Sequence, residues 1–263
     1  MIVIADWGSD SLSKQEFISA FTGFVKDPAA VRIDFVESSP SSIHAGFLAA
    51  QIVETEERDS QPEDTVIFIN YDTRQQKEGA ELIIGRLSSG IYIFGPNAEY
   101  NFSFIKPKID ELFNYQLENT GTQFRSRDLY SRIGAHLADE MEDEMDLEEA
   151  HTNIIPQLTE YFIGHIDNFG NIKTTIPYDY LKGKYELNEK IKIKINTTEK
   201  SPTFVNGLFQ GTEGELIIYP GSSGPKENPY LEISVWQHFN DERQMNALTA
   251  FNHPRPGMKI ELT

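Results

Sequence analysis

Helix-type and strand-type patterns alternate along the first half of the chain, and this alternation limits the folds open to it. Short apolar runs at residues 2–5, 31–36 and 65–70 have the composition of buried strands. Between them, residues 14–24 and 43–53 carry apolar side chains at helical spacing. Strands that alternate with helices favour a mainly parallel sheet with both faces covered.

Three further segments complete this half. Residues 82–84 and 90–94 predict two more strands, and the continuously apolar run at 65–70 is predicted to be buried on both faces. Residues 128–149 carry apolar side chains at every fourth position, which predicts a long helix. The acids of residues 139–149 then fit the solvated face of that helix better than a metal site.

The second half contains strand patterns and turn signals with little helix. Ile191, Ile193 and Ile195 alternate with lysines, as in a half-buried strand. Glycines and prolines separate the runs, so we expect an antiparallel barrel or sandwich. The predicted strands are residues 161–166, 171–176, 190–195, 215–219 and 231–236. The fold prediction is α/β: a mainly parallel α/β sandwich domain over 1–155, then an antiparallel β-barrel domain over 159–263.

Charge and cysteine content exclude several functions. The 263 residues include 41 Asp and Glu but 23 Lys and Arg, for a net charge of −18. Such a field repels DNA and RNA, so a nucleic-acid partner is not expected. The chain has no cysteine, which excludes disulfides and thiolate zinc sites. Its 39% hydrophobic content supports a sizeable core.

Signals for membranes, metals and phosphate loops are also missing from the sequence. No apolar run approaches the roughly 20 residues that span a bilayer, and the start lacks the pattern of a secretory signal. We therefore expect a cytoplasmic protein without a membrane partner. The histidines show no metal-binding spacing, and the glycines form no phosphate loop or nucleophile elbow. We expect neither a metal nor a resident cofactor.

Polar side chains follow several of the predicted parallel strands. Asp6 follows the first strand, and a carboxylate at this edge of a sheet commonly binds sugar hydroxyls; a helix N-cap suits Asp10 or a neighbouring serine better. After the strand at 65–70, Asp72 and Arg74 are two residues apart, so both can face one cleft. An exposed loop ion pair explains these two residues equally simply. Asn97 lies in a third polar loop at the same edge.

The string Asp167-Asn-Phe169-Gly-Asn171 is the most distinctive in the second half. It lies between two predicted strands, and Gly170-Asn171 suits a tight hairpin turn. A plain hairpin accounts less readily for Asp167 and Phe169. An aromatic ring beside amide and carboxylate groups suits an adenine or amino-acid pocket.

Taken in order, these strings resemble those of one family over nearly the whole chain. Asp6-Trp-Gly is similar to its opening Thr-Asp-Phe-Gly, and Gly95-Pro-Asn97 to its Pro-Asp-Asn-Gly loop. Phe124-Arg-Ser-Arg-Asp128 resembles its Phe-His-Gly-Arg-Asp helix start, and Asp167 to Thr174 its Ile-Asp-x-Phe-Gly-Asn-x-x-Thr-Asn. Ser222-Ser-Gly224 with Leu231-Glu-Ile233 resembles its closing motifs. The family is the S-adenosylmethionine (SAM) hydrolases, or SAM hydroxide adenosyltransferases, which are related to fluorinase and chlorinase.

The resemblance implies a fold, an assembly and a reaction. The family joins an α/β domain to a β-barrel and forms homotrimers, with the ligand between one subunit's first domain and its neighbour's second. Water displaces methionine at the 5′ carbon of SAM, giving adenosine without a metal. Carried over by position, Asp6 holds the ribose hydroxyls. The adenine side is lined by Phe169, Asn171, Ser223 and Glu232, while Asp167 and Asn97 lie near other polar groups of the nucleoside ligand.

The departures from the family pattern cluster at catalytic positions. The loop of the family's catalytic acid is shortened to residues 70–74, so that either Asn70 or Asp72 takes the acid's place and Arg74 the arginine's. The family histidine falls on Arg125, which stays protonated and accepts no proton from water. Two hypotheses follow: an active SAM hydrolase that uses Asp72, Arg74 and Arg125, or a catalytically degenerate homologue that binds a nucleoside or another small ligand.

Overall fold

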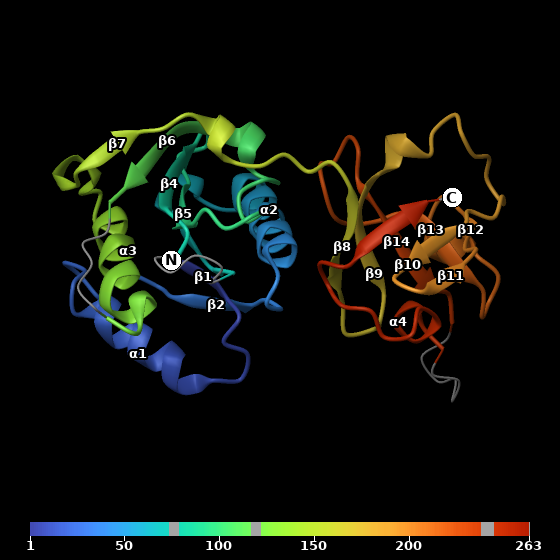
Figure 1. Ribbon diagram of the computed structural model, residues 1–263, viewed down its shortest axis with the longest axis horizontal. Coiled ribbons are helices and arrows are strands. Elements are labelled where there is room, and N and C mark those ends of the chain that lie inside the picture. The colour runs from blue at the N-terminus through green and yellow to red at the C-terminus, as the bar shows by residue number, and fades with distance from the viewer. Residues whose placement is uncertain (74–78, 117–121, 238–244, 263) are drawn as a thin grey trace. The chain divides into compact units, whose positions relative to one another are not determined.

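The fold is mixed α/β, with one large sheet in each half of the chain (Figure 1). The computed structural model describes residues 1–73, 79–116, 122–237 and 245–262. The chain divides into two compact units, Met1–Gln157 and Leu158–Thr263. In the described part of the chain, every helix is too short or too polar to cross a bilayer.

The sheet of the first unit is parallel in one half and antiparallel in the other. Its strand order is β2-β1-β3-β5-β4-β6-β7, and only the first four of these strands run parallel. The prediction of a mainly parallel sheet is therefore wrong for β4, and β6 and β7 were not predicted as strands. The link between β4 and β5 is too short for the crossover that parallel neighbours need, so these strands pair as a hairpin. The strands are β1 (Ile2–Ala5), β2 (Asp34–Glu37), β3 (Val66–Asn70), β4 (Leu82–Leu87), β5 (Tyr92–Pro96), β6 (Ile109–Tyr115) and β7 (Leu147–Glu149).

Apolar side chains from both faces of this sheet enter separate cores. On β3, Phe68 packs in the core under α1 and α3, whereas Ile67 and Ile69 pack in the core under α2. All three side chains are fully buried, which confirms the prediction for residues 65–70. Figure 1 shows α1 beside α3, with α2 across the sheet. The helices are α1 (Ser11–Thr22), α2 (Ser42–Asp59) and α3 (Ser131–Ala138).

The acidic segment is not the continuation of a helix. The predicted helix over residues 128–149 begins as a π-helical turn, Ser126–Tyr130, continues as α3 and ends at Ala138. The acids then form a turn, a short 3₁₀ helix and the edge strand β7. Like charges three and four residues apart repel along a helix, and acids oppose the negative end of its dipole, so the charge outweighs the apolar spacing.

The second unit builds an eight-stranded sheet that curls into half of a barrel (Figure 1). Its order is β11-β10-β15-β8-β9-β14-β13-β12, antiparallel except for the pair β12–β13. The alternation predicted over 190–195 is present, with Ile191, Ile193 and Ile195 in the core. The elements are β8 (Tyr161–Ile166), β9 (Ile172–Pro177), β10 (Ile193–Ile195), β11 (Thr198–Lys200), β12 (Thr203–Phe204), β13 (Leu216–Pro220), β14 (Tyr230–Val235), β15 (Lys259–Leu262) and the short helix α4 (Ala247–Ala250).

Candidate functional site

The carboxyl ends of β1, β3 and β5 bring polar side chains to one edge of the first sheet. Asp6 follows β1, Asn70 ends β3, and Asn97 follows β5. Asp6 is exposed, and the N-cap of α1 is Asp10, which accepts hydrogen bonds from the two backbone N–H groups that follow it by two and three residues. That leaves the Asp6 carboxylate available for another role at the edge where α/β sheets bind ligands.

Tyr71 lies near three carboxylates at this edge. Its pKa is raised, first by burial and then by the negative charges of Glu99, Asp6 and Asp72. The structure thus brings together Asp6 and Asp72, which come from different motifs. Glu99 was missed by the sequence reasoning; its backbone is left-handed at φ +48° and its carboxylate accepts a hydrogen bond from Ser42 Oγ at 2.9 Å.

Asp72 and Arg125 meet over Gly79. The Asp72 carboxylate accepts a hydrogen bond from the Ala80 backbone N–H at 3.2 Å. A Cβ atom built on Gly79 would lie 2.5 Å from Arg125 Nη1 and 2.7 Å from Asp72 Oδ2. The two predicted catalytic side chains therefore share the space above one glycine. Arg74 lies outside the described residues.

The side chain of Asn70 binds the start of the following helical segment. Its Oδ1 atom accepts a hydrogen bond from Ser126 Oγ at 2.8 Å. This contact ties the start of the π-helical turn to the end of β3, next to Arg125 in the sequence. Of the two alternatives for the acid position, Asp72 is the one at Gly79 beside Arg125.

Two asparagines organise the loop after β5. Asn97 donates from Nδ2 to the Ile154 carbonyl at 3.1 Å, so its amide anchors a neighbouring chain segment. Asn101 is fully buried and donates to the carbonyls of Tyr71 and Pro96, both at 2.9 Å. It ties the loops after β3 and β5 together. No sequence signal distinguishes a clamping asparagine of this kind from an ordinary loop residue.

In the second unit, Asp167 caps the hairpin between β8 and β9. Its Oδ1 accepts from the backbone N–H groups of Phe169 at 2.9 Å and Asn171 at 3.0 Å, and its Oδ2 accepts from Asn171 Nδ2 at 3.0 Å. The interpretation that a hairpin leaves Asp167 unexplained is therefore wrong. The same bonds orient the Asn171 amide, whose Oδ1 accepts from Ser234 Oγ.

A buried polar network continues from that amide along β14. Ser234 and Glu232 are two residues apart on this strand and so share one face. Glu232 accepts from the Tyr219 hydroxyl at 2.8 Å and from Lys173 Nζ at 2.9 Å. The pKa of Tyr219 is raised, first by burial and then by the Glu232 charge. The sequence reasoning found Asn171 and Glu232 but missed Lys173, Tyr219 and Ser234, although the period of two marks Ser234 once Glu232 is chosen.

Two predicted site residues have features that are typical of ligand-binding positions: a buried hydroxyl without a partner in the described part of the chain, and an exposed aromatic ring. Ser223 is 2% exposed, and its Oγ finds no hydrogen-bonding partner among the described residues. Buried hydroxyls are nearly always paired, and the exceptions tend to mark functional positions. Phe169 is 61% exposed, an unusual state for a ring of that size.

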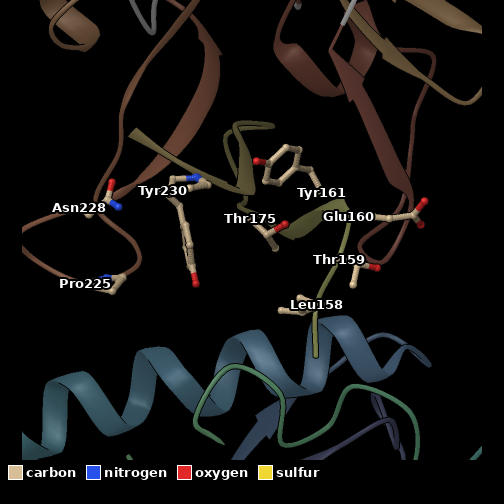
Figure 2. A pocket seen from close by; sticks show the side chains of 9 residues that line it. Leu158, Thr159, Glu160, Tyr161, Thr175, Pro225, Asn228 and Tyr230 are labelled. Carbon is tan, nitrogen blue, oxygen red and sulfur yellow. The ribbon is translucent and has the colours of Figure 1, made fainter. Parts of the chain in front are cut away.

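A separate open groove of about 390 Å³ lies in the same unit (Figure 2). Tyr161 and Tyr230 are among the side chains that line it, as are Thr175 and Asn228. Thr175 Oγ1 accepts from the Phe162 backbone N–H at 2.8 Å. The predicted site residues are not among those that line this groove. In the described ranges, no group of three or more His, Asp or Glu side chains is arranged to hold a metal ion.

Solved structures with this fold cover the whole chain. A crystal structure of an uncharacterized conserved protein from Thermotoga maritima superposes with a TM-score of 0.71 at 19% identity, covering 100% of this chain and 99% of that one. A conserved hypothetical protein from Thermus thermophilus gives 0.65 at 15% identity, with 100% and 99% coverage. At these identities the likeness shows the fold alone.

Sequence comparisons connect the chain to proteins of described function. The chain is 30% identical over 158 residues to the (R)-S-adenosyl-L-methionine hydrolase of Methanocaldococcus jannaschii. That alignment covers 58% of this chain and 57% of the relative. Residues 162–243, which include the Asp167 hairpin and most of the polar network, match the sequence model of the SAM hydroxide adenosyltransferase C-terminal domain. Together these matches support a relationship of the chain to the SAM hydroxide adenosyltransferase family.

Proposed function

We propose that the protein hydrolyses SAM to adenosine and methionine. The observation that carries the proposal is the meeting of Asp72 and Arg125 above Gly79, because it sets a carboxylate beside a fixed cation at the ligand-binding edge of the sheet. The hydrolase name of the relative agrees with this reaction.

In the proposed reaction, a water oxygen bonds to the 5′ carbon as the bond from that carbon to sulfur breaks. The bonding pair goes to sulfur, and neutral methionine leaves. The water proton passes to Asp72 and then to solvent, since Arg125 is already protonated and acts only as a positive charge. Exclusion of water from around these charges strengthens their action on the reacting atoms.

The remaining predicted residues bind the substrate. Asp6 holds the ribose hydroxyls, and the adenine side is recognised by Phe169, Asn171, Ser223 and Glu232. Asp167 and Asn97 act through the segments that their side chains anchor. Arg74, two residues after Asp72 in the sequence, contributes a second positive charge. We further propose that the two compact units are separate domains, with boundaries near 155 and 159, in a cytoplasmic homotrimer without a cofactor.

Product analysis tests the reaction. Purified protein incubated with SAM should release adenosine and methionine in equal amounts, as measured by liquid chromatography. Asp72→Asn should lower the rate by about 10²-fold or more, the scale on which general-base catalysis operates. Asp64→Asn, an acid in the turn before β3, is the matched control and should retain the rate.

The second hypothesis rests on Arg125 in place of the family histidine. A degenerate homologue would bind adenosine in calorimetry yet release no product at high protein concentration, and that result would overturn the hydrolase proposal. A gain of activity in Arg125→His would identify the missing histidine as the cause. Absence of both binding and turnover would reject both hypotheses.

A further inference from the structure

A widened helical turn separates Arg125 from Tyr130. Residues Ser126–Tyr130 are π-helical, and the Ser131 backbone N–H bonds back to the Ser126 carbonyl, five residues earlier. In such a turn, residues five apart lie over one another, whereas in an α-helix they diverge. The π turn therefore brings residues 125 and 130 to the same face. Turns of this kind are rare and are frequent at functional sites.

Tyr130 is held rigidly at the end of this turn. Its side chain is 3% exposed, and its ring packs edge-on against Phe68, with ring centroids 5.4 Å apart. Its hydroxyl lies within reach of the Arg125 guanidinium, which has donors and no acceptor, so the hydroxyl can accept a hydrogen bond from it. Burial raises the pKa of Tyr130, while the nearby Arg125 charge acts in the opposite direction. The phenol is thus a neutral, fixed acceptor.

The Arg125 guanidinium also lies near Asp72, the proposed general base. Arg125 Nη1 and Asp72 Oδ2 both lie against the missing side chain of Gly79. Tyr130 also feels the Asp72 charge, so the three groups form one cluster. A long arginine side chain has much conformational freedom to lose, and one fixed hydrogen bond from its guanidinium to a buried hydroxyl restricts it.

We propose that Tyr130 is a positioning residue that fixes the Arg125 guanidinium beside Asp72. This inference rests on the proposed hydrolysis and assigns a role to a residue outside the family motifs. Arg125, held in place, keeps the Asp72 carboxylate directed toward the attacking water. Loss of the Tyr130 hydroxyl leaves Arg125 mobile, which impairs the chemical step more than substrate binding.

The kinetic test compares two tyrosines of the same core. Tyr130→Phe removes only the hydroxyl and keeps the ring on Phe68. Tyr92→Phe is the matched control, since Tyr92 belongs to the same buried cluster but hydrogen-bonds Glu142. We expect kcat for SAM hydrolysis to fall about tenfold in Tyr130→Phe, as for one lost hydrogen bond to a charged group, with KM changed less than about twofold. Wild-type kcat in Tyr130→Phe, or equal losses in both variants, would overturn the proposal.

A second measurement does not depend on turnover. Rotation of the Arg125 guanidinium about its Nε–Cζ bond can be followed by NMR of arginine-labelled protein, with the signal assigned from Arg125→Lys. Tyr130→Phe should accelerate this rotation, and Tyr92→Phe should leave it unchanged. If the wild-type protein releases no adenosine, the proposed function fails but this measurement still decides the role of Tyr130. Unchanged rotation in Tyr130→Phe would refute it.

Discussion

At the scale of single residues, the candidate site depends on a glycine, whose lack of a side chain leaves room for its neighbours. Gly79 has φ +76°, a left-handed backbone that glycine adopts without strain, and leaves space that Asp72 and Arg125 fill. Gly183 has nearly the same backbone, φ +75°, but no atom lies within 4 Å of its missing Cβ. A comparison of substitutions at these two glycines therefore distinguishes the effect of backbone strain from the effect of displacing neighbouring side chains.

Gly79→Ala and Gly183→Ala should therefore introduce the same backbone strain but differ in their effect on enzymatic activity. Both should lower the free energy of unfolding by about 1 kcal/mol, the usual penalty for a left-handed alanine. Only Gly79→Ala pushes Asp72 and Arg125 apart, so only this variant should lose SAM hydrolysis, by about tenfold or more. Urea titrations and product assays on both variants check this. Equal activity in the two would show that the space above Gly79 is unimportant.

A buried tyrosine predicts how stability depends on pH. The pKa of Tyr92 is raised to about 12, first by burial and then by its hydrogen bond to Glu142. An unfolded tyrosine ionises near pH 10, so the contribution of Tyr92 is complete below about pH 10 and is lost as the pH rises toward 12. The free energy of unfolding of Tyr92→Phe should fall less steeply with pH over this window than that of the wild type, with a difference of about 2 kcal/mol or less. Denaturant titrations at about pH 9, 10 and 11 measure the difference, and parallel curves would contradict it.

At the scale of elements, patterns of apolar residues predicted strands better than they predicted strand direction. The strand at 65–70 was predictable because burial on both faces leaves a continuous apolar run, and the helix at 43–53 because burial on one face leaves a helical period. The direction of β4 depends on the short link to β5, which a pattern search does not weigh. The acidic segment failed as a helix because charge repulsion acts between side chains that the apolar period ignores.

One glycine sets the distance between two site-bearing strands. A Cβ on Gly95 of β5 would overlap the Ile69 carbonyl oxygen of β3, and its φ of +153° is disfavoured for other residues. Gly95→Ala should therefore separate the strands and lower the free energy of unfolding by about 3 kcal/mol, as overpacking does. Gly85→Ala in β4, where the nearest atom would be 3.4 Å away, is the control and should change stability by less than about 1 kcal/mol. Chemical denaturation distinguishes the two.

At the scale of the whole chain, polar side chains of the candidate site are divided between two units with separate cores. The strings around Asp6 and Asn171 were recognisable in the sequence because motif residues lie close together along the chain. Asn101, Tyr130 and Lys173 were not, because each acts through partners distant in sequence or through a turn type that no pattern announces.

Separate cores imply separate stability. Residues 1–157 and 158–263, expressed apart, should each unfold cooperatively, since the apolar clusters of each unit are made only of its own residues. Circular dichroism during thermal melting of the two fragments and the full chain measures this. A fragment that stays unfolded at every temperature would show that its unit depends on the rest of the chain.

The positive charge of Arg125 affects the substrate and the product of the proposed reaction differently. In the proposed reaction, the Arg125 guanidinium repels the sulfonium of intact SAM, but not the uncharged thioether of methionine. Bond breaking therefore relieves a repulsion that binding had imposed. In the proposed reaction, repulsion from Arg125 is therefore weaker in the product complex than in the substrate complex, which favours release of neutral methionine.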